Sequence, residues 1–461
     1  MKSPSELGEQ ELIEYIAGQR WYGSKGREVA RAAVVDCGEL PGVLIALIEV
    51  QFPEGTHELY QLVAGDELDG LAEPAVAREV IHLLRTGKPQ PTTGEGTIEF
   101  HALEGFAGLG TELTSARLIQ SEQSNSSVVF DEDVILKVFR RLEAGINPEL
   151  EMLRFLTERG FRNIAPLGGW YAYIGRPVEA TLGLLQEFVR DAQDGWELAL
   201  DELAEVPERF LGRLRRLGEV TGEMHTLLAS DSSDPSFCPE EPSPESLGLL
   251  TATIDEEIER VFMELPEDVE SLEPIRGRGQ DVRERLRQRT HAGAAGRVIR
   301  HHGDFHLGQT LWAPEPPGLE GRRGALPTAL PASGDWVILD FEGEPARSLP
   351  ERRRKRSPLR DVAGMLRSFA YAASAVEIIR GEPAPPGWEE RARAEFLDGY
   401  LETVDAAIIP PGREAMDKLL SVFELEKAVY ELRYELNMRP DWLPIPVAGI
   451  LRMLEEEPVT T

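Results

Sequence analysis

The segment His301-His302-Gly303-Asp304-Phe305-His306-Leu307-Gly308-Gln309 decides how this chain is interpreted. It places a carboxylate, Asp304, and an amide, Gln309, five residues apart between two short apolar stretches. His302 and His306 have the four-residue spacing of paired zinc ligands on a helix, but a glycine lies between them and no Glu follows His302, so the zinc-protease pattern fails. The remaining interpretations are a functional polar loop and a structural turn whose histidines are hydrogen-bonded.

A second acidic segment, Asp335-Trp336-Val337-Ile338-Leu339-Asp340-Phe341-Glu342-Gly343-Glu344-Pro345, strengthens the functional interpretation. An apolar strand ends here in Asp340, and carboxylates at a strand end suit a hard cation that bridges phosphates. In protein kinases the catalytic loop carries an aspartate that accepts the substrate hydroxyl proton, and an amide five residues later binds magnesium. Asp304 and Gln309 have that separation.

Lysine is scarce in this chain, and Lys137 lies in the apolar run Val134-Ile135-Leu136-Lys137-Val138-Phe139. A strand lysine can simply extend its amine to water. The alternative is a lysine that neutralises nucleotide phosphates and is held by a helical glutamate. A helix is predicted to begin after Asn147, with Pro148 at its first position. We expect Glu151 to be the partner; Glu149 is the other candidate, although the helix dipole already explains an acid in the first turn.

The polar segment Ser121-Glu122-Gln123-Ser124-Asn125-Ser126-Ser127 lies between two strand-like runs. On its own it is a hairpin turn without glycine. Together with the other segments it predicts a phosphate-binding loop, in which Ser124, Asn125 and Ser126 contact the phosphate oxygens.

Composition limits the classes of partner. The chain has 461 residues, with 49 Lys and Arg against 81 Asp and Glu, and a formal charge of −32. Such a balance argues against general binding of nucleic acid or of an anionic membrane surface. Any anionic ligand therefore needs a local basic or metal-loaded site. Two cysteines and no apolar leader predict a cytoplasmic, reducing compartment.

The pattern along the chain predicts an α+β fold with two or three domains. Three regions are expected: an N-terminal β-rich cap at 1–92, a β-rich intermediate domain at 93–190, and a mainly helical lobe at 191–461. Three stretches are predicted as loops, at 231–248, 314–334 and 381–387. The basic island Glu351-Arg352-Arg353-Arg354-Lys355-Arg356 is either a solvated loop or an anchor for acidic neighbours or a partner.

In this order, the segments described above resemble the aminoglycoside-phosphotransferase-like kinases and, more narrowly, the bacterial maltokinases. Three further stretches are typical of the narrower family: Gln19-Arg20-Trp21-Tyr22, Ser357–Phe369 and Arg439–Pro446. The resemblance covers essentially the whole chain and implies a bilobal protein kinase-like fold behind a cap. The segment 314–334 departs from the short hairpin that is usual in the family.

The resemblance implies ATP-dependent phosphorylation of maltose at its anomeric hydroxyl, which feeds α-glucan synthesis from trehalose, and trehalose synthase as a partner. It assigns Asp304 as catalytic base, Gln309 and Asp340 as Mg²⁺ ligands, and Lys137 as phosphate ligand. The adenine hinge falls within Gln186–Val189, which includes Glu187.

For the sugar, the expectation combines the resemblance with a stripe on one side of a helix predicted at Glu424–Asn437. The residues expected to contact the sugar are His306, Glu342, Lys427, Tyr430, Glu431, Tyr434 and Trp442. Lys427, Tyr430, Glu431 and Tyr434 form the stripe on the helix. The alternative for the stripe is that its tyrosines are core and its charges solvated. For the whole protein the alternatives are a glucosamine kinase, which shares the cap, and a pseudokinase that acts as a scaffold.

Overall fold

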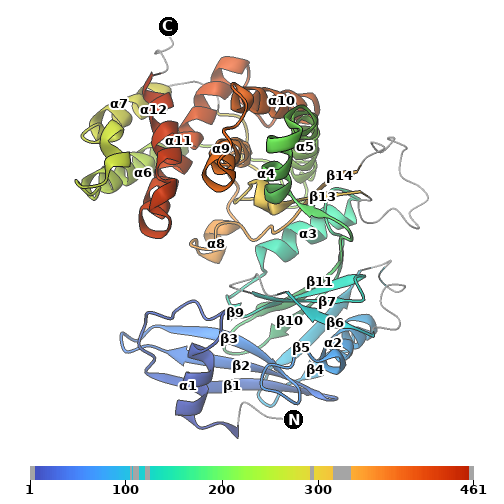
Figure 1. The fold of residues 1–461 in the computed structure, drawn as a ribbon. Helices are drawn as coiled ribbons and strands as arrows, with labels where there is room; N and C mark the ends of the chain where they lie inside the picture. The colour runs from blue at the N-terminus through green and yellow to red at the C-terminus, as the bar shows by residue number, and fades with distance from the viewer. Residues whose placement is uncertain are drawn as a thin grey trace. The chain divides into compact units, whose positions relative to one another are not determined.

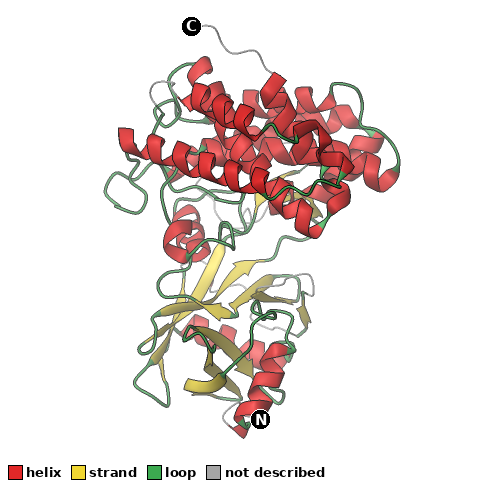
Figure 2. Cartoon of the chain, turned by 90° about the vertical axis from the view of Figure 1, so that its left-hand side faces the viewer, coloured by secondary structure: helices red, strands yellow, loops and turns green. Residues whose placement is uncertain are grey.

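The computed structural model describes residues 6–103, 106, 114–119, 125–290, 295–314 and 334–455. The chain forms two compact units, which are described separately below: Met1–Ala192 with Ala313–Val337, and Gln193–Trp312 with Ile338–Thr461. The first consists mainly of strands and the second mainly of helices (Figure 2). The predicted α+β class, with a β-rich N-terminal part and a helical C-terminal part, is confirmed. Most of the predicted loop 314–334 lies outside the described residues.

The first sheet of the β-rich unit has the strand order β1-β2-β3-β9 and is antiparallel. Its strands and covering helix (Figure 1) are α1 (Glu9–Ala17), β1 (Arg31–Leu40), β2 (Val43–Gln51), β3 (His57–Ala64) and β9 (Arg141–Leu142). Almost all of β2 is buried, as its continuous apolar run requires. Leu12 and Ile16 of α1 pack with Trp21 and Tyr60 in a small core of their own.

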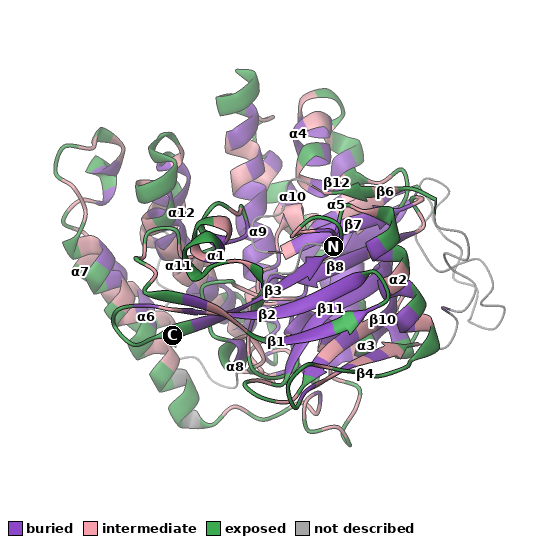
Figure 3. Ribbon diagram, turned by 90° about the horizontal axis from the view of Figure 1, so that it is seen from below, coloured by how far each residue is buried: buried purple, intermediate pink, exposed green. Residues whose placement is uncertain are grey.

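The second sheet has seven antiparallel strands in the order β4-β5-β10-β11-β8-β7-β6. The elements are α2 (Pro74–Thr86), β4 (Gln90–Pro91), β5 (Thr97–Ala102), β6 (Ala116–Leu118), β7 (Asn125–Phe130), β8 (Val134–Phe139), α3 (Pro148–Glu158), β10 (Leu167–Ile174) and β11 (Ala180–Glu187). The central strands β8 and β11 are almost entirely buried (Figure 3). Lys137 pairs with Ser127 on one side and Leu184 on the other, so it lies in the middle of the sheet.

The two sheets share one hydrophobic core, which includes Leu47 of β2, Leu136 of β8 and Leu185 of β11. Gln61 of β3 is fully buried and connects the sheets through hydrogen bonds. Its side-chain amide donates to the carbonyl oxygens of Phe139 at 3.0 Å and Leu182 at 2.7 Å. A buried amide without such partners would be destabilising, so this connection fixes β3 against the second sheet.

The helical unit begins with strand β12 (Gln193–Asp194), which pairs with β13 (Thr310–Ala313). Its elements are α4 (Gly195–Glu205), α5 (Pro207–Leu228), α6 (Pro244–Met263), η3 (Glu270–Ile275), α7 (Gly279–Thr290), η4 (Leu307–Gln309), α8 (Leu349–Arg352), α9 (Leu359–Ala375), η5 (Val376–Arg380), α10 (Trp388–Thr403), α11 (Arg413–Met438), η6 (Pro440–Trp442) and α12 (Pro444–Glu455). Strand β14 (Asp335–Ile338) leads into the segment that carries Asp340. Helix α11 is much longer than the predicted 424–437.

Helices α5 and α10 lie side by side (Figure 1) and approach closely at glycines. A Cβ on Gly218 would overlap the carbonyl oxygen of Phe396, so only glycine fits there. The predicted loop 231–248 is wrong at its end, because α6 begins at Pro244. The Ser243 hydroxyl accepts a hydrogen bond from the Ser246 N–H and caps this helix.

One helical stretch in the part of the chain that the structure describes, Leu359–Arg380, is long and apolar enough to cross a membrane. Of its most apolar 18-residue window, 67 % is buried inside the protein. The stretch consists of α9 and η5, and α9 packs against α11 and α10. Its apolar character is therefore that of a core helix in the helical unit.

Candidate active site

The predicted catalytic loop is fixed by a buried carboxylate, Asp361 of α9. Asp361 accepts hydrogen bonds from the backbone N–H groups of His302 at 2.7 Å and Gly303 at 2.9 Å. His225 of α5 lies 3.1 Å from the same carboxylate, and its other ring nitrogen lies 3.1 Å from the Tyr400 hydroxyl. Burial alone would raise the pKa of Asp361, but the surrounding histidines hold it well below its usual range. The loop therefore rests on an ionised group inside the helical core.

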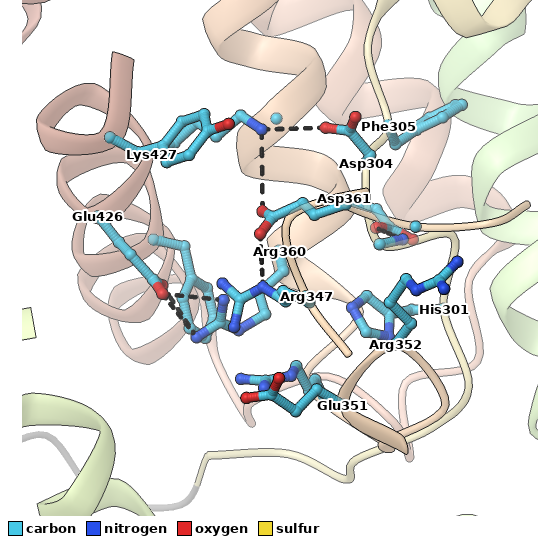
Figure 4. A pocket seen from close by; sticks show the side chains of 17 residues that line it. His301, Asp304, Phe305, Arg347, Glu351, Arg352, Arg360, Asp361, Glu426 and Lys427 are labelled. Atoms are coloured by element: carbon cyan, nitrogen blue, oxygen red, sulfur yellow. Dashed lines mark hydrogen bonds and ion pairs between the residues drawn. The ribbon is translucent and has the colours of Figure 1, made fainter. Parts of the chain in front are cut away.

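The side chain of Asp304 lies beside Lys427 of α11. The ammonium of Lys427 donates to Asp304 Oδ1 at 3.1 Å and lies 4.0 Å from Glu344 (Figure 4). Burial opposes ionisation of Asp304, but the charge of Lys427 outweighs it and lowers the pKa of the carboxyl. The same carboxylates raise the pKa of Lys427 against the effect of its burial. Asp304 is thus held as a carboxylate, the form in which it can accept a proton.

Gln309 and Asp340, the two predicted metal ligands, are adjacent. The side-chain amide of Gln309 donates to Asp340 Oδ2 at 3.1 Å, and the Leu339 N–H donates to the Gln309 carbonyl oxygen. Asp340 has a φ of 58°, an uncommon conformation for a residue other than glycine, and one that functional sites often contain. A carboxylate oxygen of Glu342 lies within 4.8 Å of one from Asp340. Carboxylate and amide oxygens are the donors that magnesium prefers, so this set fits that ion.

In the β-rich unit, Lys137 forms a buried ion pair with Glu149. The distance from Lys137 Nζ to Glu149 Oε2 is 2.7 Å. The partner that the structure shows is thus Glu149, the other candidate, and not the expected Glu151. Glu149 is 2 % exposed, and two residues further along the helix correspond to a rotation of roughly 200°, which turns the half-buried Glu151 to another side. Asn147 caps α3 as predicted, accepting a hydrogen bond from the Glu149 N–H.

The predicted phosphate loop is described only in part. Ser124 lies outside the described residues, and Asn125 begins β7. The Ser126 hydroxyl is buried and accepts a hydrogen bond at 2.8 Å from Arg140, which also pairs with Asp69 at 2.6 Å. In this arrangement Ser126 faces Arg140, so its assignment as a phosphate contact is not supported.

The predicted adenine hinge, Gln186–Val189, begins in β11 and runs past the end of that strand at Glu187. The amide of Gln186 donates to the Ala165 carbonyl oxygen, and the Glu187 N–H donates to the Pro166 carbonyl oxygen. Val189 is buried just beyond the strand. The Gln186 side chain and the Glu187 N–H are thus engaged within the unit, and the hinge assignment stays a prediction.

A cavity of about 70 Å³ opens beside Asp304 in the helical unit. Of the residues predicted to bind the sugar, Lys427 and Tyr430 line it, together with Asp304 itself. Four arginines and four further acidic residues also line the wall (Figure 4): Arg347, Arg352, Arg356, Arg360, Glu344, Glu351, Asp361 and Glu426. Glu344 and the arginines were not predicted as site residues, although two of the four arginines, Arg352 and Arg356, lie in the basic island that the sequence shows.

The other predicted sugar residues lie elsewhere in the helical unit. Glu431 is buried against Arg367, with an oxygen–nitrogen distance of 2.7 Å, and Tyr434 is exposed. The Trp442 ring packs against the ring of Tyr371 at a centroid distance of 6.1 Å. Glu431, Tyr434 and Trp442 therefore do not line the cavity, and their assignment to the sugar stays a prediction.

The last two residues predicted to bind the sugar, His306 and Glu342, lie two residues after Asp304 and Asp340, respectively. His306 Nδ1 accepts a hydrogen bond from the Gly308 N–H, and burial lowers the pKa of its ring, so the imidazole is neutral. Glu342 lies 3.7 Å from a guanidinium nitrogen of Arg352. Neither lines the cavity. The role of Asp361 could have been inferred from an acid in the first turn of an otherwise apolar helix.

Comparison with known proteins agrees with this architecture. Residues 15–83 match the family model of the maltokinase N-terminal cap domain. A glucosamine kinase from Streptacidiphilus jiangxiensis is 24 % identical over 444 residues, covering 89 % of this chain and 94 % of the relative. A glucosamine kinase from Mycolicibacterium smegmatis is 26 % identical over 356 residues, covering 74 % and 80 %.

Among solved structures, a glucosamine kinase in complex with glucosamine, ADP and inorganic phosphate superposes with a TM-score of 0.70 at 19 % identity. The match covers 96 % of this chain and 98 % of that one. Crystal form A of glucosamine kinase gives a TM-score of 0.69 with the same coverage. At this identity the likeness establishes the fold, which is that of the kinases. The chain thus carries a region similar to the maltokinase cap at residues 15–83 and has this kinase fold over nearly its whole length.

Proposed function

We propose that this chain transfers the terminal phosphoryl group of ATP to the anomeric hydroxyl of maltose, giving maltose 1-phosphate. The observation that carries the proposal is the placement of an ionised Asp304 on the wall of a cavity. Gln309 lies on the same loop, and Asp340 accepts a hydrogen bond from its side-chain amide. A positioned carboxylate that can accept a hydroxyl proton is what phosphoryl transfer to an alcohol requires. ATP is the expected donor, and the related glucosamine kinase was solved with ADP.

Each residue has a distinct role in this mechanism. Asp304 orients the sugar hydroxyl and takes its proton as the bond to phosphorus forms. Gln309 and Asp340 would hold Mg²⁺, which neutralises phosphate charge when bound. Lys137, kept in place by Glu149, would contact the phosphates of the nucleotide. Asp361 acts through the backbone of the loop and keeps Asp304 in position, which matters because most of the acceleration comes from alignment.

Lys427 favours a neutral acceptor over an amino sugar. Its ammonium pairs with Asp304, and together with Arg347 it neutralises Glu344 as well, so neither carboxylate is left to attract a cationic sugar. An ammonium group about 5 Å from Lys427 would be repelled by about 3 kcal/mol at an effective dielectric constant of about 20. Maltose carries no charge and avoids this repulsion.

Glucosamine remains the second candidate acceptor, because both named relatives that match over most of the chain are glucosamine kinases. Release of ADP from ATP and Mg²⁺ should be measured with maltose, glucosamine, glucose and choline in parallel. We expect maltose to give the highest kcat/KM. A preference for glucosamine would contradict the argument from Lys427, and nucleotide binding without turnover of any acceptor would indicate a scaffold.

The wider assignments follow from the same proposal. Maltose 1-phosphate would enter α-glucan synthesis, trehalose synthase would be the physical partner, and the protein would work in the cytoplasm. Co-purification of the tagged chain with trehalose synthase from its own cells would test the partnership.

A further inference from the structure

The cavity beside Asp304 has a strongly basic end. We call the arginine end the part formed by His301, Arg347, Arg352, Arg356 and Arg360. The arginines come from three neighbouring segments: the loop before α8, the basic island, and the first turn of α9. In a protein with a formal charge of −32, four guanidinium groups around one small cavity are an exceptional concentration of positive charge.

Two of these arginines have clear ionic partners. Arg347 donates to Glu344 at 2.5 Å, and Arg360 lies 2.9 Å from a carboxylate oxygen of Glu426 (Figure 4). Arg352 is directed toward Glu342, donating to its carbonyl oxygen at 3.3 Å. These pairs neutralise part of the arginine end within the protein.

Arg356 is the exception. Among the residues that the structure describes, its guanidinium has no hydrogen bond or ion pair, and only its backbone is bonded, to Ile299. Partial burial and the nearby charges of Arg360 and Arg347 lower the pKa of Arg356 to about 10. Glu426 and Glu351 act on this arginine only through space. An arginine held near other arginines without a directly bonded carboxylate is further stabilised by an anion that enters from solution.

Glu351 does not form a hydrogen bond or ion pair with the Arg356 guanidinium. Its Oε2 accepts hydrogen bonds from the backbone N–H and the hydroxyl of Ser348, closing the capping box of α8. The side chain lies on the exposed side of that short helix. The positive charge of Arg356 is therefore left facing the cavity.

His301 provides an independent observation. The residue is 8 % exposed and lines the cavity, and its Nδ1 has no hydrogen-bond partner among the described residues. Burial lowers the pKa of its ring to about 3, so the imidazole is neutral. A buried ring nitrogen without a partner is uncommon and can be satisfied by a ligand in the adjoining space.

We infer that the arginine end is a binding site for a phosphate group, with Arg356 as its principal contact and His301 as a second. A tetrahedral oxyanion matches the forked donors of arginine. The cavity of about 70 Å³ holds roughly five water-sized positions at about 10–15 Å³ each, which is enough for such a group. The phosphate belongs either to free orthophosphate or to a phosphorylated sugar whose ring extends toward Asp304. The inference rests on the cavity and does not require that maltose be the acceptor.

The test is calorimetric titration of the full chain without nucleotide, magnesium or acceptor. The ligands are orthophosphate, maltose 1-phosphate and maltose, with potassium chloride at the same ionic strength as the blank. Arg356→Gln removes the proposed contact. Arg354→Gln is the matched control, because Arg354 belongs to the same island, carries the same charge, is exposed and does not line the cavity.

We expect orthophosphate to bind the wild-type chain and Arg354→Gln equally, and to bind Arg356→Gln at least about tenfold more weakly. Tighter binding of maltose 1-phosphate than of orthophosphate would identify a sugar phosphate as the source, and the reverse would identify the free ion. Equal weakening in both variants, or no heat beyond the chloride blank, would overturn the inference. If Arg356→Gln fails to fold, His301→Gln with phosphate gives the same comparison, because it must also weaken binding. Activity is not read, so the result is separate from that of the acceptor panel.

Discussion

Replacing Lys427 with methionine should move the acid limb of the pH–rate profile to higher pH. Lys427 Nζ lies 3.1 Å from Asp304 Oδ1, a distance at which opposite charges attract by about 5 kcal/mol at an effective dielectric constant of about 20. Both side chains are 24 % exposed, so water screens part of this energy. An adjacent opposite charge lowers a carboxyl pKa by about 1–3 pH units, and we expect the lower part of that range.

The direction follows from the sign of the interaction. The ammonium lowers the pKa of Asp304, so its removal raises that pKa, and the carboxylate that accepts the proton is lost at a higher pH. The acid limb of kcat/KM should therefore shift upward by about 1–2 pH units. Methionine is unbranched and only one atom shorter than lysine, so the shape of the wall near Tyr430 changes little.

The assay is initial-rate release of ADP with the preferred sugar, measured from pH 4.5 to 8.5 as kcat/KM. Lys418→Met is the matched control, because Lys418 lies on the same helix and pairs with Glu414 at 2.7 Å, outside the cavity. Its profile should coincide with that of the wild type. An acid limb that stays in place in Lys427→Met, with activity preserved, would refute the assignment of Asp304 as the base.

Three further changes test the remaining parts of the site. Asp304→Asn should reduce kcat by about 10²–10⁴ with nucleotide affinity intact by titration, and near-normal turnover would exclude it as the base. Glu149→Gln should raise KM for ATP about tenfold or more, since it removes the buried partner of Lys137. Glu151→Gln should leave KM for ATP within about twofold of the wild-type value. A larger effect of Glu151→Gln than of Glu149→Gln would instead favour Glu151 as the functional partner of Lys137. Asp361→Asn should destabilise the protein by about 3–5 kcal/mol in urea unfolding at pH 7. Because folding lowers the pKa of Asp361, the ionised carboxylate stabilises the folded protein above about pH 4, and this stabilisation is lost as the pH falls further. The difference in free energy of unfolding between the wild type and Asp361→Asn must therefore become smaller at acid pH.

Local patterns in the sequence were sufficient to single out the groups proposed to bind the metal and accept the proton. The five-residue interval from Asp304 to Gln309 and the strand that ends near Asp340 are short-range features, and the structure places Gln309 against Asp340. The helix after Asn147 was also predictable, because its cap and its proline act within a single turn.

What depended on packing between distant segments could not be predicted. The choice between Glu149 and Glu151 is a choice between two sides of one helix, and it depends on which side meets β8. Glu431 shares a helical stripe with Lys427, but Arg367 from another helix neutralises it. The basic island was visible in the sequence, whereas its closure around a cavity beside Asp304 required the fold of three segments.

The buried amide of Gln61 has a practical consequence for anyone who wishes to express the catalytic part alone. Residues 15–83, the matched cap, contribute Leu47 and Gln61 to the same interior as Leu136 and Leu185. Removal of the cap would expose the apolar face of the second sheet and would leave the Phe139 and Leu182 carbonyl oxygens without the hydrogen bonds from Gln61. The cap is therefore not a detachable module, and fragments that begin near residue 93 should be recovered as aggregates rather than as working enzyme.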